Sequence, residues 1–142
     1  MMLGMRWTGV DTTTAIDVAG TGHNGSFGTT DDVASITTVT DAAVHIICVA
    51  PAQNDQTSIT ATGYSTAQEM SANQRRASAL YKSITSAGAT GTVTVTFTSS
   101  DVANDFSFAL RPVAAAAGQP TSKRLGGVQY VGLNSTPQGQ VW

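Results

Sequence analysis

Strict alternation of polar and apolar residues runs through positions 91–98, which read Gly-Thr-Val-Thr-Val-Thr-Phe-Thr. Because successive side chains of a β-strand point to opposite faces, Val93, Val95 and Phe97 fall on one side and the threonines fall on the other. A strand of this kind has one buried face and one solvated face, as in antiparallel sheets. The pattern recurs in weaker form along most of the chain, so it predicts an all-β protein.

Turn signals separate the apolar runs at roughly the 8–12-residue spacing that is typical of β-sandwiches and β-barrels. We therefore expect an antiparallel two-sheet sandwich, jelly-roll-like, with about eight strands. The expected strands span residues 5–10, 14–18, 33–40, 43–50, 58–64, 76–85, 92–98 and 104–111. The glycine turn at 86–90 is expected to fold strand 76–85 back onto strand 92–98, and strand 104–111 is expected to place Phe106, Phe108 and Leu110 on one face.

Residues 66–84 also allow a helical interpretation. Apolar residues recur there at helical spacing, at Ala77, Leu80, Tyr81 and Ile84. Thr66, with Glu69 three residues later, imitates a capping box at a helix N-terminus. A helix within this stretch is therefore an alternative to the strand.

The composition changes after position 112. Residues 113–142 contain an alanine run and many glycines and prolines, yet they also hold apolar residues between positions 128 and 142. We predict a β-sandwich domain over residues 1–112, which includes the N-terminal segment, and an extended C-terminal arm over 113–142. The alternative is that residues 128–133 add a closing strand to the same domain.

Charge is scarce in this sequence. Charged residues make up 11% of the 142 residues, against roughly 25% in typical globular proteins, and roughly a quarter of the residues are Ser or Thr. Such a surface suits a chain that lies against neighbouring subunits. The formal net charge is −2 and basic residues cluster only in pairs, so we expect no nucleic-acid partner. Without a secretory signal or an apolar run near the roughly 18 residues of a membrane span, we expect synthesis in a reducing, soluble compartment and no membrane partner.

Several motifs imitate functional sites. Residues 20–25 match the dinucleotide-binding fingerprint, but the residues that follow cannot begin the helix that would hold a pyrophosphate. Gly63-Tyr-Ser-Thr-Ala lacks the second glycine of a nucleophile elbow. Cys48 is expected to be a small buried hydrophobic residue and His45 a hydrogen-bonded structural imidazole. We therefore predict no enzymatic activity, no catalytic residue and no cofactor.

Asp31 and Asp32 are the sequence's candidates for metal ligands. Together with loop carbonyls they could bind calcium, but two adjacent carboxylates in a turn are more often simply solvated. The two histidines show no metal-ligand spacing. The prediction is that the chain has no metal site.

The stretch 41–112 contains several short sequence motifs. It opens with Asp-Ala-Ala-Val-His-Ile, continues with Gly-Tyr-Ser after a Thr-rich run and with Ala-Ser-Ala-Leu-Tyr-Lys, and then reads Ala-Gly-Ala-Thr-Gly-Thr-Val-Thr-Val-Thr-Phe before closing with Phe-Ala-Leu-Arg-Pro. This half of the chain resembles the β-sandwich modules of tailed-phage virion proteins. Similar modules occur in capsid decoration proteins, head fibres and tail appendages.

The resemblance implies a structural virion protein. Because the chain is short and lacks long repeats or a coiled coil, it looks most like a decoration or cementing protein on the capsid exterior. Such a protein would bridge subunits of the major capsid protein and would also contact copies of itself, as a dimer or trimer. The alternative is a tail-associated or head-fibre module, acting as a connector or tail subunit, or binding host carbohydrate through exposed aromatic residues such as Phe27 and Tyr64.

Apolar residues near the two ends are the candidates for contacts with these partners, because chain ends without a partner tend to fray. The candidates are Met1, Met2, Leu3, Met5, Trp7, Tyr130, Leu133, Val141 and Trp142. The alternative is that they pack against their own sandwich.

Overall fold

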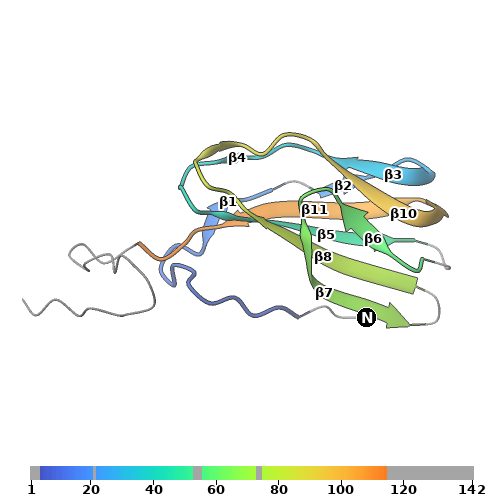
Figure 1. The fold of residues 1–142 in the computed structure, drawn as a ribbon, viewed down its shortest axis with the longest axis horizontal. Coiled ribbons are helices and arrows are strands. Elements are labelled where there is room, and N and C mark those ends of the chain that lie inside the picture. Colours follow the sequence, from blue (N-terminus) through green and yellow to red (C-terminus); the bar gives the residue numbers. More distant parts are fainter. Residues whose placement is uncertain (1–3, 21, 53–55, 73–74, 115–142) are drawn as a thin grey trace, which may run out of the picture.

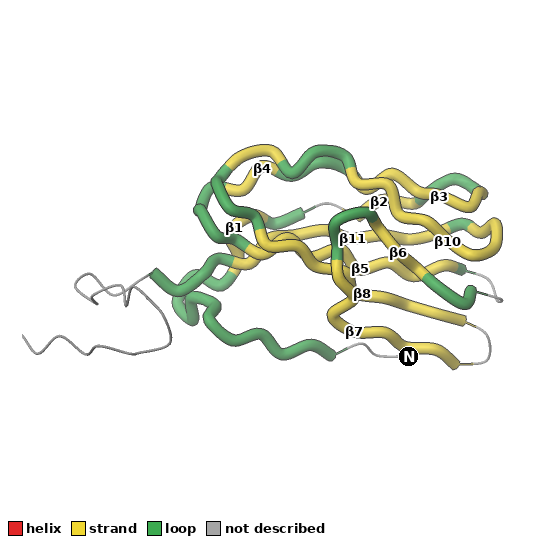
Figure 2. Tube along the Cα trace, viewed as in Figure 1, coloured by secondary structure: helices red, strands yellow, loops and turns green. Residues whose placement is uncertain are grey.

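The computed structural model describes residues 4–20, 22–52, 56–72 and 75–114 (Figure 1). These residues form 11 strands, and all other described segments are loops or turns (Figure 2). No described segment is a helix long and apolar enough to cross a bilayer. The predicted all-β fold is confirmed.

The strands form two main antiparallel sheets that pack face to face. In the six-stranded sheet the order is β1-β11-β5-β8-β7, and β2 also pairs with β11; in the three-stranded sheet it is β3-β10-β6. The six-stranded sheet consists of β1 (Ile16–Val18), β2 (Gly22–Asn24), β5 (Val44–Pro51), β7 (Ser65–Ala72), β8 (Arg75–Ser83) and β11 (Ala103–Leu110). The three-stranded sheet consists of β3 (Gly28–Val33), β6 (Ile59–Ala61) and β10 (Val93–Asp101). The predicted two-sheet sandwich is confirmed.

Two short strands extend the second sheet. β4 (Thr37–Thr38) pairs with β9 (Gly88–Ala89). This pair continues the register of the β3–β10 pair, because Val33 faces Val93 and Thr37 faces Ala89. Between the two paired regions the Thr90 amide donates to the Ile36 carbonyl at 2.8 Å. The paired segments therefore form one long ribbon, which lies along the top of the view in Figure 1.

The core lies between the sheets and follows the alternation seen in the sequence. Val93, Val95 and Phe97 of β10 are buried, whereas the threonines between them are exposed. The residues that complete the core cluster are Val33, Ile47, Val49, Ile59, Ala61, Leu80 and Ala103. Burying this apolar surface at roughly 25 cal/mol per Å² is the main force that holds the sheets together.

The helix considered within residues 66–84 is wrong, because β7 and β8 form an antiparallel pair there. Leu80 faces the core, while Tyr81 lies on the opposite side of β8 and contacts Trp7. Since both faces of β8 carry packed apolar residues, its sequence loses the two-residue alternation of a half-buried strand. The helical spacing arises from this double burial.

The predicted hairpin between strands 76–85 and 92–98 is also wrong. β8 pairs with β5 and β7, and β10 pairs with β3 and β6, so the two segments belong to different sheets. Residues 84–92 instead carry the chain across the sandwich through β9. In this arrangement Leu80 and Val95 both contribute to the core cluster from opposite sheets.

Residues 9–10 lie beside residues 112–113. The expected strand 5–10 does not form; Val10 makes an isolated bridge with Pro112, and the Val113 amide donates to the Gly9 carbonyl at 2.8 Å. The predicted arm over 113–142 lies outside the described residues from position 115 onward.

A buried carboxylate fixes the edge of the sandwich. Asp17 of β1 accepts hydrogen bonds from the Val39 amide at 2.8 Å and from the amide and hydroxyl of Thr40, and it pairs with the Arg111 guanidinium at 3.4 Å. Burial opposes the ionised form, yet these hydrogen bonds outweigh it, so the pKa of the Asp17 carboxyl lies below its ordinary value. The contact joins β1 to the chain after β4 and to the end of β11.

Candidate functional site

The side of the six-stranded sheet that faces away from the core is unusually apolar. Ile47, Leu80 and Ala103 point into the core, so the alternate residues of β5, β8 and β11 point outward. We call the outward set the outer face; its apolar residues include Ile46, Cys48, Ala77, Ala79, Tyr81, Phe106, Phe108 and Leu110. Because outward positions of an antiparallel sheet are usually polar, this face requires an explanation.

Phe106, Phe108 and Leu110 share one side of β11, as predicted, but that side is the outer face. The side of β11 that points into the sandwich carries Asp105 and Ser107, both of which are buried. Alternation reveals which residues share a face; it does not reveal which face is covered.

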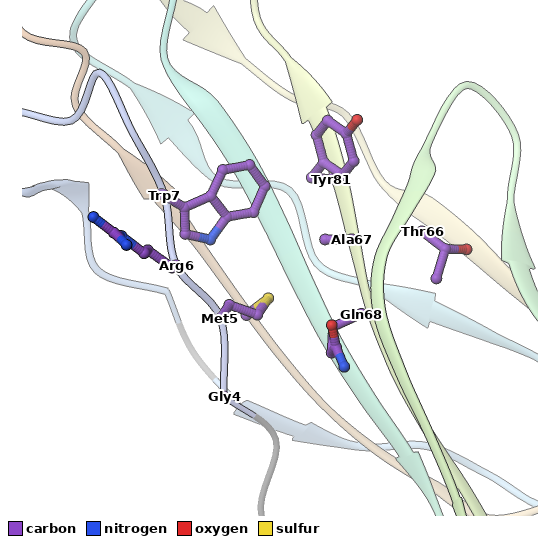
Figure 3. Close-up of a pocket in the computed structure, with 8 residues that line it drawn as sticks. All are labelled: Gly4, Met5, Arg6, Trp7, Thr66, Ala67, Gln68 and Tyr81. Atoms are coloured by element: carbon purple, nitrogen blue, oxygen red, sulfur yellow. The ribbon is translucent and has the colours of Figure 1, made fainter.

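The N-terminal segment, residues 4–7, lies over the half of the outer face around Tyr81. The Trp7 ring contacts Tyr81 edge to face, with centroids 5.3 Å apart and an interplanar angle of 71°. A groove of about 320 Å³ runs beneath the segment, and Figure 3 shows Met5 and Trp7 on one side of it, with Gln68 and Tyr81 on the other. Ile46 is completely buried although it points outward from the sheet. The segment therefore acts as a cover for this half.

The other half of the outer face is open. Phe106 is 45% exposed, and its ring packs against the ring of Phe108 with the centroids 5.6 Å apart. Beside it lies a shallow apolar pocket whose lining includes Cys48, Ala50 and Ala77. Burial raises the pKa of the Cys48 thiol, which keeps it neutral and apolar.

Of the residues predicted to contact partners, the structure describes Met5 and Trp7. Both are half-buried on their own sheet, which is the alternative that the sequence left open. The other candidates lie outside the described residues: Met1, Met2, Leu3, Tyr130, Leu133, Val141 and Trp142. Sequence reasoning did not single out the open half around Phe106, although Phe106 and Phe108 were recognised as neighbours on one face.

Replacing Trp7 with alanine is expected to destabilise the isolated protein by about 2 kcal/mol. The substitution removes the ring contact with Tyr81, and a half-buried tryptophan contributes less than the 3–5 kcal/mol typical of full burial. Urea unfolding of the Ala and Phe variants measures the effect, and the Phe variant should retain most of the stability. An unchanged midpoint for Trp7→Ala would mean that Trp7 does not cover the sheet in solution.

The inner polar pair His45 and Tyr64 is structural. The His45 Nδ1 atom lies 2.6 Å from the Tyr64 hydroxyl, and His45 has no solvent exposure. Burial, with a smaller contribution from the charge of Lys82, lowers the pKa of His45 to about 4. Burial also raises the pKa of Tyr64 to about 12. The Tyr64 hydroxyl thus contacts an interior residue. Phe27, the other aromatic residue considered for carbohydrate binding, is 65% exposed on the loop between β2 and β3.

The adjacent pair Asp31 and Asp32 does not form the calcium site considered from the sequence. The two side chains point to opposite sides of β3: Asp32 is exposed and accepts a 2.7 Å hydrogen bond from the Thr94 hydroxyl, whereas Asp31 is buried. Asp31 instead lies with His23 and Asp105. The loop that imitated a dinucleotide fingerprint thus supplies His23, from β2.

Within this cluster the His23 Nδ1 atom lies 3.2 Å from Asp105 Oδ2 and 3.6 Å from Asp31 Oδ1. Burial raises the pKa of the Asp105 carboxyl; a hydrogen bond with Asp31 adds to the increase, and His23 opposes it. No spacing in the sequence could have revealed this group, because its members come from three strands. We call it the His–Asp–Asp cluster.

Comparison with known proteins finds no matching family model, no matching curated protein and no matching solved structure.

Proposed function

We propose that this chain is a structural virion protein of a tailed phage, which decorates the outside of the capsid and bridges subunits of the major capsid protein. The observation that carries the proposal is the open half of the outer face, where Phe106 is 45% exposed beside an apolar pocket. Contiguous apolar surface on a soluble protein marks a site of contact with another macromolecule. The resemblance of residues 41–112 to phage virion modules indicates which macromolecule.

The two sides of the sandwich differ in chemistry. The outer face of the six-stranded sheet is apolar, whereas the exposed residues of β10 on the opposite sheet include Thr94, Thr96 and Thr98. Hydroxyl groups, together with the exposed Asp32 carboxylate beside Thr94, keep that side hydrated. We expect the apolar side to lie on the shell and the threonine-rich side to face solvent.

Cementing requires little chemistry. A shell filled with packaged DNA is under strain, and a small rigid sandwich that spans subunit joints resists it through many weak contacts repeated by symmetry. The chain is expected to act as a dimer or trimer on the shell, so that each assembly reaches several capsid subunits.

Replacing Phe106 with serine is expected to weaken binding to capsid shells by about tenfold, because an aromatic residue in a desolvated contact contributes more than 1 kcal/mol. Cosedimentation of the purified chain with shells stripped of it measures the affinity. Phe27→Ser is the matched control, since it also removes one exposed phenylalanine, from a loop outside the outer face.

Equal thermal midpoints of the two variants would confirm that both remain folded. Binding by Phe106→Ser at the affinity of the unchanged chain would contradict the assignment of the open half as the contact surface. Loss of binding in Phe27→Ser alone would move the contact to the loop.

A tail-associated or head-fibre module is the second candidate, and the exposure of Phe27 is the observation that favours it. An exposed aromatic ring on a loop suits stacking against a sugar. In that case Phe27→Ser should abolish binding to host cells, while Phe106→Ser should leave it unchanged.

A further inference from the structure

The His–Asp–Asp cluster joins the two sheets of the sandwich. His23 comes from β2 and Asp105 from β11, both in the six-stranded sheet, whereas Asp31 comes from β3 of the three-stranded sheet. One donor atom from each of the three residues lies within 4.8 Å of the other two. His23 and Asp31 are close together in the chain, whereas Asp105 lies far from both in sequence.

The spacing of the donors fits a metal ion. Two ligands that bind Zn²⁺ at about 2.0–2.1 Å in a tetrahedron lie roughly 3.4 Å from each other. The His23 Nδ1 atom lies 3.2 Å from Asp105 Oδ2 and 3.6 Å from Asp31 Oδ1, on either side of that value. The third spacing, between the two carboxylates, is within 4.8 Å, so the carboxylates would close around the ion as it binds.

An unpartnered oxygen provides an independent indication. The side chains of Asp31 and Asp105 are 4% and 1% exposed, and the Asp31 Oδ2 atom is buried without a hydrogen-bond partner among the described residues. Two carboxylates this close and this buried repel each other unless a proton or a cation lies between them. A buried acceptor without a donor costs free energy, which a cation held by both oxygens of the Asp31 carboxylate would recover.

The backbone leaves room for this arrangement at Gly25. A Cβ atom at that position would lie 2.4 Å from the Asp31 carboxylate, so any larger residue would push the carboxylate out of the cluster. The Gly25 amide donates to the Ala103 carbonyl at 2.8 Å, which holds the loop close to β11. His23 is 48% exposed, so solvent can reach its side of the cluster.

We propose that His23, Asp31 and Asp105 bind one divalent transition-metal ion, Zn²⁺ in the first instance, which fastens the two sheets together. One imidazole and two carboxylates suit Zn²⁺ better than Ca²⁺, which takes 6–8 oxygen ligands. Three protein ligands with access for water on the His23 side leave a fourth position for a water molecule. The role is structural, and the proposal does not rest on the proposed contact with the shell.

The test uses the full untagged chain, stripped with a chelator and then dialysed against Zn²⁺, Mn²⁺, Ca²⁺ or Mg²⁺ separately. We expect one Zn²⁺ per chain by elemental analysis, and a rise in the thermal midpoint on the order of 10 °C when free Zn²⁺ is 100 times its Kd. Co²⁺ in place of Zn²⁺ should give the visible absorption of a tetrahedral site.

His23→Gln, Asp31→Asn and Asp105→Asn should each weaken Zn²⁺ binding at least tenfold, while Asp32→Asn should leave it unchanged. Asp32 is the matched control because it neighbours Asp31 but points to the other side of β3. His23→Gln keeps the test valid if a buried variant fails to fold, since His23 is half-exposed. Absence of binding, undiminished binding in His23→Gln, or tighter binding of Ca²⁺ than of Zn²⁺ would overturn the proposal.

Discussion

Replacing Gly20 with alanine is expected to lower the free energy of unfolding by about 3 kcal/mol or more. A Cβ atom at this position would lie 1.2 Å from the carbonyl oxygen of Ser107 and 2.3 Å from its carbonyl carbon. Both are backbone atoms, so no side-chain rotation relieves the overlap. Gly20 lies between β1 and β2, where the chain runs along the edge of β11 between two paired segments.

β11 cannot move away to accommodate the new atom. Ser107 pairs with Ile47 of β5, and Ile47 is fully buried in the core. The segment that carries β1 and β2 must therefore separate from β11, with loss of its ladder hydrogen bonds and of the His23 contact with Asp105. An overlap of this kind exceeds the 1–3 kcal/mol usual for overpacking by a methyl group.

Urea unfolding of Gly20→Ala against Gly28→Ala measures this effect with a matched control. At Gly28 the nearest atom to an added Cβ is 3.6 Å away, which is ordinary contact, so that variant should remain within about 0.5 kcal/mol of the unchanged protein. If the two variants were equally stable, the close approach of Gly20 to β11 would not exist in solution.

Acidification from pH 6.5 to pH 4 is expected to cost up to about 3 kcal/mol of stability through His45 alone. The pKa of His45 is about 4 in the folded protein, against roughly 6.5 in an unfolded chain. Between these values the unfolded chain binds the proton and the folded chain does not. The stabilisation is therefore complete above pH 6.5 and is lost as the pH falls toward 4.

The groups that face His45 explain why it stays neutral. The Tyr64 hydroxyl occupies its Nδ1 side, and the charge of Lys82 further disfavours a second positive charge. The pKa of Tyr64 is about 12, so this hydroxyl does not titrate in the acidic range. Protonation of His45 would place an unpaired cation in the interior.

Urea unfolding at pH 4, 5, 6 and 7 of the unchanged protein and of His45→Gln isolates this contribution. A glutamine side chain at this position cannot take up a proton in this range, so the stability difference between the two proteins should shrink or reverse as the pH falls. Every other titratable group is present in both proteins, so its contribution cancels in the difference. Parallel pH profiles would show that His45 is not buried as a neutral imidazole.

Much of the fold follows from local patterns, and the failures have physical causes. Val93, Val95 and Phe97 were recognised because only one face of β10 is buried. β8 imitated a helix because both of its faces carry apolar residues, and β7 was not recognised because its residues, Ser-Thr-Ala-Gln-Glu-Met-Ser-Ala, show no apolar alternation. Strand pairing also failed for β8 and β10, since a short turn suggested neighbours where the chain crosses between sheets.

The candidate sites depended even more on tertiary structure. The outer face became visible only when the core identified the inward residues of β5, β8 and β11, which left Phe106 on the outside. The His–Asp–Asp cluster brings together residues 23, 31 and 105 from three strands, and its formation requires the sandwich itself. Asp31 and Asp32 looked like one site in the sequence, but strand alternation separates them.

The copy number of this chain in mature particles tests the central claim most directly. Heads and tails would be separated after purification, and the chain would be quantified in each fraction relative to the major shell protein. The decoration role predicts many copies on heads, in a simple ratio to the shell subunit, and almost none on tails. A few copies confined to tails, or absence from particles, would contradict it.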